Sequence, residues 1–526
     1  MNDDLGQDLA HWFDLDHVPY TVRGSRLFVR RTTDGALTVY RAAYERALAD
    51  SVAVAGLRVL DGGGRQAVVV QADPWRITFD GGAHLVVTPD HRVVASVPEG
   101  FRVETDRVVE AETRLVVTGP ASADVANVAV ELSDWMDKCP QVDDEFRDVT
   151  RFCWWTLGVN TLVLDAPDGF NRAVIPSKIG YVGLWQWDAY FMAIGLRHGD
   201  VPLATEQLRI ALAHAGDDGQ LPDVVHEEGV LASSDDLPPA DLENLRRMGS
   251  PSLAHSRVPL TKPPLAALAV HFLAEKAGSQ VVDEFLSAMV AAQDWWYSAS
   301  APGGQPAYLH PYSSGLDDSP IFDHDAILVS PDLTSYLILA DRILAGWLWE
   351  RGDRAGVLRC TKRADAAVER LAATWDADRG FYPSIGEQGD PVAPETIVSL
   401  MPVLAEGLPQ EHVDGMLEAV TDPERFATPH PLPTVAVREK DFSPTEMWRG
   451  PVWVNTNWLV ATGLRARGHL DLASSIERAT VRLVAEHGPN EYFRPDTGEK
   501  PPRATTVFGW SAALTVDLAV RLSTAS

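Results

Sequence analysis

The sequence predicts a mainly α-helical protein in which an N-terminal β domain precedes a large helical domain. Short apolar runs separated by turn signals fill about the first 135 residues, and helical periodicity dominates the rest of the 526-residue chain. The character changes near Lys138-Cys139-Pro140. We therefore expect a β domain over residues 1–137 and a helical domain over residues 138–526.

The N-terminal region reads as several short strands. Apolar runs at residues 27–29, 68–70 and 85–87 are rich in Val, Leu and Phe, the residue types that favour strands. Turn signals such as Asp61-Gly62-Gly63-Gly64 and Asp80-Gly81-Gly82 separate such runs. Strands of this length and spacing predict a β-sandwich-like domain.

Helical periodicity appears after residue 140. Phe146, Val149, Cys153 and Leu157, for example, fall on one helical face. About twelve such segments follow one another, and they begin near residues 143, 187, 201, 263, 279, 332, 356, 394, 409, 454, 469 and 507. Twelve helices suit an (α/α)6 barrel, in which functional loops gather at one end. A plain bundle or a solenoid is the alternative, but no repeat of about 33–47 residues supports a solenoid.

Composition limits the class of protein and its partners. The chain is 45% apolar and 23% charged, as soluble globular proteins are. Subtracting 74 acidic from 45 basic residues gives a net charge of −29, so we expect no nucleic acid and no membrane as partner. Three scattered cysteines lack a CxxC pair, and residues 1–5 lack the basic and apolar segments of a signal peptide. Both observations favour a cytoplasmic protein.

A loop with paired carboxylates, residues 312–320, is the first candidate for chemistry. Asp317 and Asp318 stand between Gly315 and Pro320. A neighbouring anion raises the pKa of a carboxyl group, so that it can hold a proton near neutral pH and protonate a leaving oxygen. Capping of backbone amides at a turn is the alternative reading.

Two runs rich in tryptophan lie far from this loop in the sequence. In the first, Trp185 and Trp187 predict a platform for the C–H face of a sugar ring, and Asp188 offers a carboxylate to two adjacent hydroxyls. The alternative is the start of a buried helix in which Asp188 is a cap.

The second run is Met447-Trp448-Arg449-Gly450-Pro451-Val452-Trp453. Arg449 offers a rigid fork of donors to hydroxyls or to a carboxylate, and Trp448 and Trp453 extend the aromatic surface. The alternative is that Arg449 stacks on Trp448 and pairs with a structural acid.

Near the end of the chain, Glu491 opens a loop of aromatic and turn residues, where a carboxylate can activate water. A surface glutamate beside a turn is the alternative. No HExxH-like spacing of His, Asp and Glu indicates a metal site, and no Gly-rich loop indicates a bound phosphate. We therefore expect no metal and no cofactor.

Taken together, these runs resemble motifs of glycoside hydrolase family 63 and its relatives among the trehalases and the mannosylglycerate and glucosylglycerate hydrolases. The matching segments are Trp185 to Asp188, Ser314 to Pro320, Trp448 to Trp453, Glu491 to Gly498 and Phe508 to Ala512. The resemblance covers about residues 140–526. It implies an (α/α)6 barrel and an inverting mechanism.

The resemblance also implies roles for individual residues. Asp317 matches the general acid and Glu491 the general base, and an inverting pair needs its carboxyls about 6.5–9.5 Å apart. The positions that line the sugar pocket of the family match Trp185, Asp188, Trp448, Arg449, Trp453 and Trp510.

Three positions depart from the family pattern. Leu316 replaces a methionine, which is conservative, and Asp318 replaces an asparagine, which adds a negative charge beside Asp317. We expect Asp318 to be one of the substrate-binding residues. Lys262 stands where the family has glutamine before two prolines. A lysine that faces the pocket prefers an anionic group such as a carboxylate on the aglycone, whereas a shifted loop makes it a surface residue.

We therefore expect an exo-acting, inverting glycosidase of the α-glucosidase or α-mannosidase type that acts on a short soluble glycoside. If Lys262 faces the pocket, we expect the aglycone to be anionic. A glycoside phosphorylase or lyase on the same barrel is one alternative, and a non-catalytic sugar-binding protein is another. Neither the identity of the sugar, the linkage and the aglycone nor the oligomeric state follows from the sequence.

Overall fold

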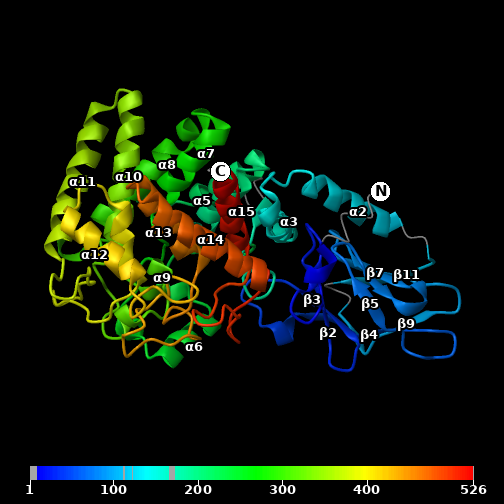
Figure 1. The fold of residues 1–526 in the computed structure, drawn as a ribbon. Helices are drawn as coiled ribbons and strands as arrows, with labels where there is room; N and C mark the ends of the chain where they lie inside the picture. Colours follow the sequence, from blue (N-terminus) through cyan, green and yellow to red (C-terminus); the bar gives the residue numbers. More distant parts are fainter. Residues whose placement is uncertain (1–8, 110–112, 121–122, 165–171, 525–526) are drawn as a thin grey trace.

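The computed structural model describes residues 9–109, 113–120, 123–164 and 172–524, so the acidic start at residues 1–5 lies outside the described residues. A β domain and a helical domain lie side by side (Figure 1). The predicted order, a sandwich-like β domain followed by a helical barrel, is confirmed. The boundary between residues 137 and 138 stays a prediction.

Two sheets form the β domain. The first has the strand order β1-β2-β3-β4-β10, with β9 also paired to β4, and the second has the order β11-β8-β7-β6-β5. All neighbours pair antiparallel except β8 and β11, which are parallel. Their bounds are β1 (Tyr20–Thr21), β2 (Leu27–Arg31), β3 (Leu37–Arg41), β4 (Val52–Leu60), β5 (Val69–Ala72), β6 (Ile77–Phe79), β7 (His84–Val87), β8 (Arg92–Ser96), β9 (Arg102–Glu104), β10 (Arg107–Val108) and β11 (Arg114–Thr118).

One element of this region differs from the expectation of strands alone. Residues 123–136 form helix α2 (Ala123–Met136), which lies over the β domain in Figure 1. Val128, Leu132 and Trp135 pack inward at the i, i+4, i+7 spacing of a helix. This periodicity, rather than alternation, decides the local structure, and the assignment of the whole region to strands was wrong here.

The helical domain is a closed double ring. Each inner element contacts the next, and α15 contacts α4, so the ring closes. The inner elements are α4 (Gln186–Leu196), α7 (Ala266–Ala277), α10 (Pro331–Glu350), the 3₁₀ helix η8 (Ile397–Leu404), α13 (Val454–Ala466) and α15 (Gly509–Thr524). The outer elements are α3 (Asp144–Val159), α5 (Val201–Ala213), α8 (Gln280–Ser298), α11 (Arg354–Ala373), α12 (Gln410–Thr421) and α14 (Leu470–His487). The predicted (α/α)6 barrel is confirmed.

Eleven of the twelve expected helices are α-helices that begin within about three residues of their predicted starts. The exception is the segment expected near residue 394, which is the 3₁₀ helix η8 with Pro402 inside it. Proline has no backbone N–H to donate and its ring clashes with the preceding turn, so an α-helix is disfavoured there.

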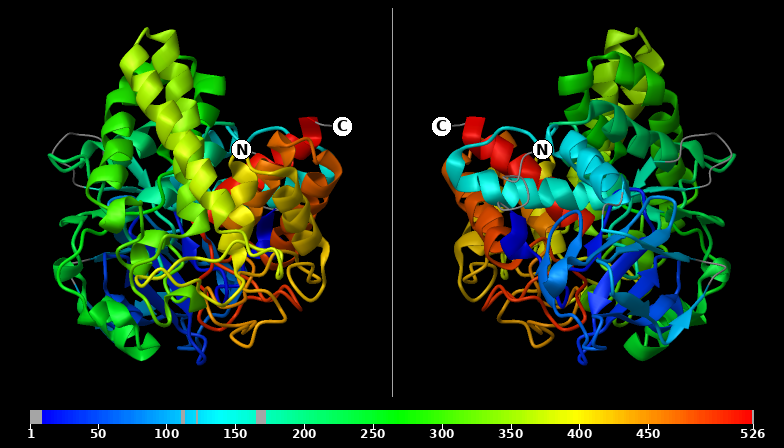
Figure 2. Two further views of the ribbon diagram at one scale, coloured as in Figure 1. Left: turned by 90° about the vertical axis from the view of Figure 1, so that its left-hand side faces the viewer. Right: turned by 90° about the vertical axis from the view of Figure 1, so that its right-hand side faces the viewer.

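Smaller elements occupy the connections. The helices α6 (Pro239–Met248) and α9 (Pro311–Ser314) were not expected. Short strands form a hairpin, β12 (Thr161–Val163) with β13 (Arg172–Val174), and a three-stranded sheet of β14 (Leu184–Trp185), β15 (Val224–His226) and β16 (Gly229–Leu231). The other 3₁₀ turns are η1 (Ala10–Trp12), η2 (Leu48–Ser51), η3 (Asp80–Gly82), η4 (Ser234–Asp236), η5 (Pro251–Ala254), η6 (Pro302–Gly304) and η7 (Pro320–Phe322). Many of these connections gather below the helices in the views of Figures 1 and 2.

Buried contacts join the two domains. The ring of Trp12 stacks on Phe152 of α3 at 4.5 Å between centroids. The buried ammonium of Lys178 donates hydrogen bonds to the hydroxyl of Thr21 at 2.8 Å and to the carbonyl of Val22 at 2.9 Å. Because these contacts exclude water, the β domain is held firmly on the barrel.

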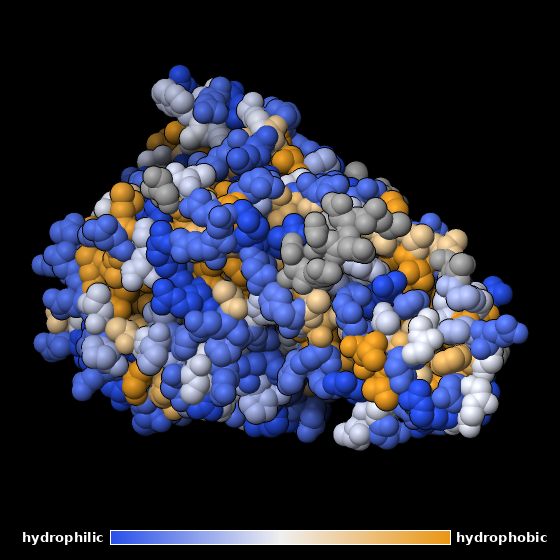
Figure 3. All heavy atoms as spheres, turned by 45° about the vertical axis from the view of Figure 1, so that its right-hand side comes forward, coloured by the Kyte–Doolittle hydropathy of each residue, from blue (hydrophilic) through white to orange (hydrophobic). Residues whose placement is uncertain are grey.

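Hydrophilic side chains cover most of the face shown in Figure 3, in keeping with the net charge of −29. In the part of the chain that the structure describes, no helix is both long and apolar enough to cross a bilayer.

Candidate active site

Three of the sequence motifs, those of Trp187, Trp453 and Trp510, stand at or just before the first residues of inner helices. Trp187 and Asp188 lie in the first turn of α4, Trp453 immediately precedes α13, and Trp510 lies in the first turn of α15. Lys262 precedes α7 by four residues. Since these side chains come from the N-terminal ends of the inner ring, the fold brings motifs hundreds of residues apart to one end of the barrel.

Trp187 is the point where the motifs meet. Its ring lies 6.2 Å from that of Trp448 and 5.3 Å from that of Trp510, measured between centroids. Trp448 in turn stacks on Trp453 at 3.7 Å with the planes 4° apart. The loop that carries the paired aspartates packs against Trp187 through Gly315, where a Cβ atom would lie 2.3 Å from the indole. Four of the predicted tryptophans, Trp187, Trp448, Trp453 and Trp510, are therefore in contact with one another.

Trp185 belongs to a second group of rings. It ends β14, is half-buried, and lies edge-on to Tyr181 at 5.7 Å. Tyr181 connects this group to Glu491, because its hydroxyl donates a hydrogen bond of 2.7 Å to Oε1 of that residue.

The carboxyl group of Glu491 is buried and well held. Its Oε2 accepts a hydrogen bond of 2.9 Å from the backbone N–H of Thr505, and its Oε1 accepts the bond from Tyr181. Burial raises the pKa of Glu491 to about 7, although the bonds from Thr505 and Tyr181 act in the opposite direction. The alternative of a surface glutamate is therefore wrong, because only 2% of the residue is exposed.

Asp317 lies in the same electrostatic neighbourhood. Burial raises its pKa to about 7, the charges of Asp223, Asp318 and Glu491 add to the increase, and the positive charge of Lys262 opposes it. Its Oδ1 is buried and has no hydrogen-bond partner among the described residues. A carboxyl oxygen that accepts no hydrogen bond favours the protonated form more than one that accepts such bonds.

Asp318 has a different environment from Asp317. Its Oδ1 accepts a hydrogen bond of 2.7 Å from the backbone N–H of Trp448, and its carbonyl accepts one of 3.1 Å from Arg449. Asp318 thus joins its own loop to the loop of Trp448 and Arg449. Since its carboxylate accepts a bond from a backbone amide, the capping alternative applies to Asp318. Its role in substrate binding stays a prediction.

Arg449 forms a two-pronged ion pair. Its two Nη atoms lie 2.8 and 2.7 Å from the carboxylate oxygens of Asp323. This pairing with a structural acid corresponds to the alternative interpretation of the motif. The bonds to Asp318 and Asp323 use three of the five N–H donors of the guanidinium, and the contact of Arg449 with substrate stays a prediction.

Lys262 faces the interior and is not a surface lysine. Its ammonium lies 2.7 Å from the carboxylate of Asp223, also donates to the carbonyl of Tyr312, and only 5% of the residue is exposed. The positive charge of Lys262 opposes the rise that burial causes in the pKa of the buried Asp188. Asp223 therefore compensates much of the charge that was expected to attract an anionic aglycone.

Two residues of the site carried a weak signal in the sequence, as Asp223 did, or none, as Tyr181 did. Asp223 follows Gln220-Leu221-Pro222 on a long loop, and Tyr181 stands in a stretch without a charged neighbour in the sequence, apart from Lys178. Both act through partners far along the chain, so only the three-dimensional structure reveals them.

Several buried polar atoms around the site have no hydrogen-bond partner among the described residues. They include Oδ1 of Asp317, Nε1 of Trp510 and Nε2 of Gln186. Buried polar groups in folded proteins are nearly always paired, so these atoms are available to bond water or a bound ligand.

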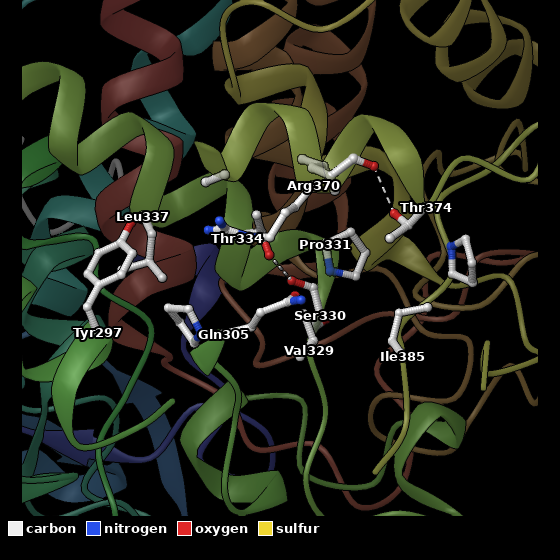
Figure 4. A pocket seen from close by; sticks show the side chains of 14 residues that line it. Tyr297, Gln305, Val329, Ser330, Pro331, Thr334, Leu337, Arg370, Thr374 and Ile385 are labelled. Carbon is white, nitrogen blue, oxygen red and sulfur yellow. Dashed lines mark hydrogen bonds between the residues drawn. The ribbon is translucent and has the colours of Figure 1, made fainter. Parts of the chain in front are cut away.

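A separate hollow lies elsewhere in the helical domain. Ser330, Pro331 and Thr334 at the start of α10 line it together with Arg370 and Thr374 at the end of α11 (Figure 4). None of the motif residues is among its lining residues, so it belongs to a different part of the barrel. No group of three or more His, Cys, Asp or Glu side chains in the described ranges is arranged to hold a metal ion.

Comparison with known proteins agrees with this arrangement. A mannosylglycerate hydrolase from Thermus thermophilus is 28% identical over 404 residues, which cover 65% of this chain and 95% of the relative. A crystal structure of a GH63 mannosylglycerate hydrolase from Thermus thermophilus in complex with glucose matches with a TM-score of 0.57 at 26% identity, over 69% of this chain and 98% of that one. The match to the mannosylglycerate hydrolase therefore leaves about a third of this chain uncovered.

A bacterial glucoamylase in complex with acarbose matches over 97% of this chain and 96% of its own, with a TM-score of 0.56 at 12% identity. That likeness concerns the fold alone and extends over both domains. The family model of the mannosylglycerate hydrolase MGH1-like glycoside hydrolase domain matches residues 181–511, which contain every motif described above except the last residue of the fifth. The chain belongs to this glycoside hydrolase family.

Proposed function

We propose that the enzyme removes a terminal α-linked hexose from a short glycoside with inversion of configuration. The observation that carries the proposal is the pair of carboxyl groups of Asp317 and Glu491. Each has a pKa raised to about 7, and the charge of Glu491 contributes to the rise for Asp317, which supports a common site near the indole rings of Trp187, Trp448 and Trp510. Carboxyl groups tuned in this way perform acid and base chemistry near neutral pH.

The surroundings of the two groups support distinct roles. Glu491 accepts two hydrogen bonds, which favour its carboxylate form, whereas Oδ1 of Asp317 accepts none from the described residues. The negative charge of Glu491 adds to the rise in the pKa of Asp317 that burial causes. In the resting enzyme Asp317 therefore holds the proton and Glu491 is the base.

In the reaction, Asp317 gives its proton to the glycosidic oxygen as the bond from that oxygen to the anomeric carbon breaks. Water attacks the anomeric carbon from the opposite face, and Glu491 takes a proton from that water. The products are the free aglycone and the sugar of inverted anomeric configuration. Proton transfer from Glu491 back to Asp317 through solvent restores the enzyme.

The remaining residues bind and orient the sugar. Trp187, Trp448 and Trp510 present ring faces and edges that exclude water, and the buried Asp188 offers a carboxyl group to adjacent hydroxyls. Holding the sugar in one pose contributes to the rate because the reacting groups are already aligned.

We propose glycerate, a small anionic aglycone, as the leaving group. The names of relatives such as the Thermus mannosylglycerate hydrolase support this substrate class. We also propose a cytoplasmic location, which the three buried, unpaired cysteines, Cys139, Cys153 and Cys360, support.

The test is to incubate the purified enzyme with mannosylglycerate, glucosylglycerate, trehalose, kojibiose and sucrose, and to follow each mixture by proton NMR. We expect the β anomer to appear first from an α-glycoside, before mutarotation. First appearance of the α anomer, or turnover that requires inorganic phosphate, would contradict the proposal.

A further inference from the structure

A loop of the β domain contacts the small sheet that carries Trp185. The loop connects β3 to η2 and includes Tyr44, whose ring stacks on that of His226 at 3.9 Å with the planes 4° apart. The backbone N–H of Tyr44 donates a hydrogen bond of 3.4 Å to Oε1 of Glu227. His226 ends β15, and Glu227 follows it in the turn to β16. The β domain therefore holds the tip of the hairpin formed by β15 and β16.

An ion pair strengthens this contact. Arg26, which immediately precedes β2, pairs with Glu227, and the two side chains are only 11% and 22% exposed. The guanidinium of Arg26 also donates to the carbonyl of Ala42, at the start of the loop of Tyr44, at 3.4 Å. Separating an ion pair that is largely shielded from water leaves charges without compensation, so the pair opposes movement of the hairpin away from the β domain.

The hairpin is joined in turn to the strand of Trp185. Val224 of β15 lies opposite Trp185 of β14 in the antiparallel register. Tyr44 also contacts Trp185 directly, with 6.2 Å between the ring centroids. Both rings pack against one small apolar cluster, which includes Val224 and is separate from the main core. The β domain thus reaches Trp185 by two routes, through the hairpin and through the ring of Tyr44.

Trp185 has another ring neighbour, which comes from the helical domain. Its indole lies edge-on to Tyr181 at 5.7 Å, and Tyr181 donates the hydrogen bond of 2.7 Å to Glu491. Two side-chain torsions set the orientation of an indole ring, so its packing neighbours decide which rotamer it keeps. One of these neighbours is bonded to the proposed base, and the other belongs to the β domain.

We propose that Tyr44 is a positioning residue for substrate binding, whose ring holds the indole of Trp185 in the orientation that receives the sugar. The ion pair of Arg26 with Glu227 keeps the hairpin and the loop of Tyr44 together. In the part of the chain that the structure describes, Tyr44 makes these contacts with its ring and its backbone N–H, so its hydroxyl is not needed. This inference rests on the function proposed above.

The inferred support comes from outside the matched family segment. Arg26 and Tyr44 precede residues 181–511, whereas Trp185 and Glu227 lie within them. The Thermus structure is covered over 98% of its length by only 69% of this chain. The positioning of Trp185 is therefore a contribution of the β domain to a site whose motif residues belong to the helical domain.

The first test is steady-state kinetics of Tyr44→Ala and Tyr44→Phe in the full chain, with mannosylglycerate or glucosylglycerate, whichever the wild-type enzyme hydrolyses faster. We expect Tyr44→Ala to raise KM about tenfold and to change kcat less than about twofold, because a contact that binds the sugar in the ground state and the transition state alike is loosened. Tyr44→Phe keeps the ring and should restore KM. A lower kcat at unchanged KM, which a partly unfolded enzyme would show, would overturn the inference, and so would equal effects of the two substitutions.

The second test is a double-mutant cycle between Tyr44 and Trp185. If Tyr44 acts through Trp185, then Tyr44→Ala should change KM less than about twofold once Trp185→Ala has removed the indole. The control is Tyr40→Ala, since Tyr40 stacks on Phe28 within the β domain at 5.1 Å, and we expect it to leave KM unchanged in either background. Full, independent effects of Tyr44→Ala and Trp185→Ala, or a Trp185→Ala variant with the wild-type KM, would overturn the inference.

A third variant keeps the inference testable if Tyr44→Ala does not fold. Glu227→Ala removes the carboxylate that Arg26 and the N–H of Tyr44 contact, and it leaves the ring of Tyr44 intact. We expect KM to rise about threefold. Glu228→Ala is the matched control, because Glu228 is the next residue of the same turn and is exposed, and it should leave KM unchanged. Equal effects of the two substitutions would overturn the part assigned to the hairpin.

The outcomes separate this inference from the proposed function. A wild-type enzyme that hydrolyses neither glycoside would overturn both. A wild-type enzyme that hydrolyses either one with inversion, and whose KM neither Tyr44→Ala nor Glu227→Ala changes, would overturn the inference alone.

Discussion

The hydroxyl of Tyr181 donates a hydrogen bond of 2.7 Å to Oε1 of Glu491, although 310 residues separate the two in the sequence. The bond favours the ionised form of the carboxyl group, so Tyr181 acts as a positioning residue for the proposed base. It also fixes the orientation of a side chain that must point one oxygen at a water molecule.

Replacing Tyr181 by phenylalanine removes this donor and little else. The pKa of Glu491 should rise, because one of the hydrogen bonds that lower it is lost. We expect the acidic limb of the pH dependence of kcat/KM to move to higher pH and the rate at pH 6 to fall about tenfold. Tyr382→Phe is the control, since the hydroxyl of Tyr382 contacts His412 instead. An unmoved acidic limb would argue against Glu491 as the base.

Replacing Asp317 by asparagine should remove the proposed general acid and leave the rest of the site in place. We expect kcat on O-glycosides to fall by about 10²–10⁴, with a much smaller loss on a glycosyl fluoride, because fluoride departs with less help from an acid. Steady-state kinetics on both substrates check this. Equal losses would indicate that Asp317 does not protonate the leaving group.

The same substitution should change stability in a pH-dependent way. The folded-state pKa of Asp317 is raised from 3.8 to about 7, so the folded protein binds a proton that the unfolded chain releases. This contribution is present in full below about pH 4 and is lost as the pH rises towards 7. We expect Asp317→Asn to raise the free energy of unfolding at pH 8 by about 1–3 kcal/mol, measured by urea denaturation, and by less at pH 4. Equal effects at both pH values would contradict the raised pKa.

Gly315 allows the loop of Asp317 to approach Trp187. Its φ is +72°, and a Cβ atom would lie 2.3 Å from the indole. We expect Gly315→Ala to lower the melting temperature and to reduce kcat/KM at least about tenfold, because the loop must move. Gly303 is a matched control, with a φ of +71° and open space around a Cβ atom, so Gly303→Ala should cost only about 1 kcal/mol of backbone strain. Equal effects of the two substitutions would show that the contact with Trp187 is unimportant.

Lys262 compensates the buried carboxylate of Asp223. Lys262→Met leaves that carboxylate unpaired, and we expect a loss of about 3–5 kcal/mol in the free energy of unfolding. The pKa of Asp317 should rise as well, because the charge of Lys262 lowers it, so the alkaline limb of the pH–rate profile should move to higher pH. Lys276→Met, at an exposed position near the end of α7, should change neither quantity. A double variant that also carries Asp223→Leu should recover part of the stability.

Much of the fold was predictable because it is encoded in local patterns. Outer helices such as α3 and α14 follow from apolar periodicity, and the motifs at the starts of α4, α13 and α15 mark where the site lies. Helix α2 was missed because its apolar residues were read as part of a strand-rich region. The pairing of Arg449 with Asp323 appeared only as one alternative, with an unnamed acid. The contacts Tyr181–Glu491 and Asp223–Lys262 join residues far apart in the sequence and have no local pattern, so only the closed ring brings them together.

The 3₁₀ helix in the inner ring has a geometric consequence. With eight residues at a rise of about 2.0 Å each, η8 spans about 16 Å, which is close to the length of the eleven-residue α4 at about 1.5 Å per residue. If the same eight residues formed an α-helix, the segment would be about 12 Å long, which is shorter than the other elements of the inner ring. By disfavouring an α-helix, Pro402 therefore keeps η8 about as long as α4, although η8 has three fewer residues.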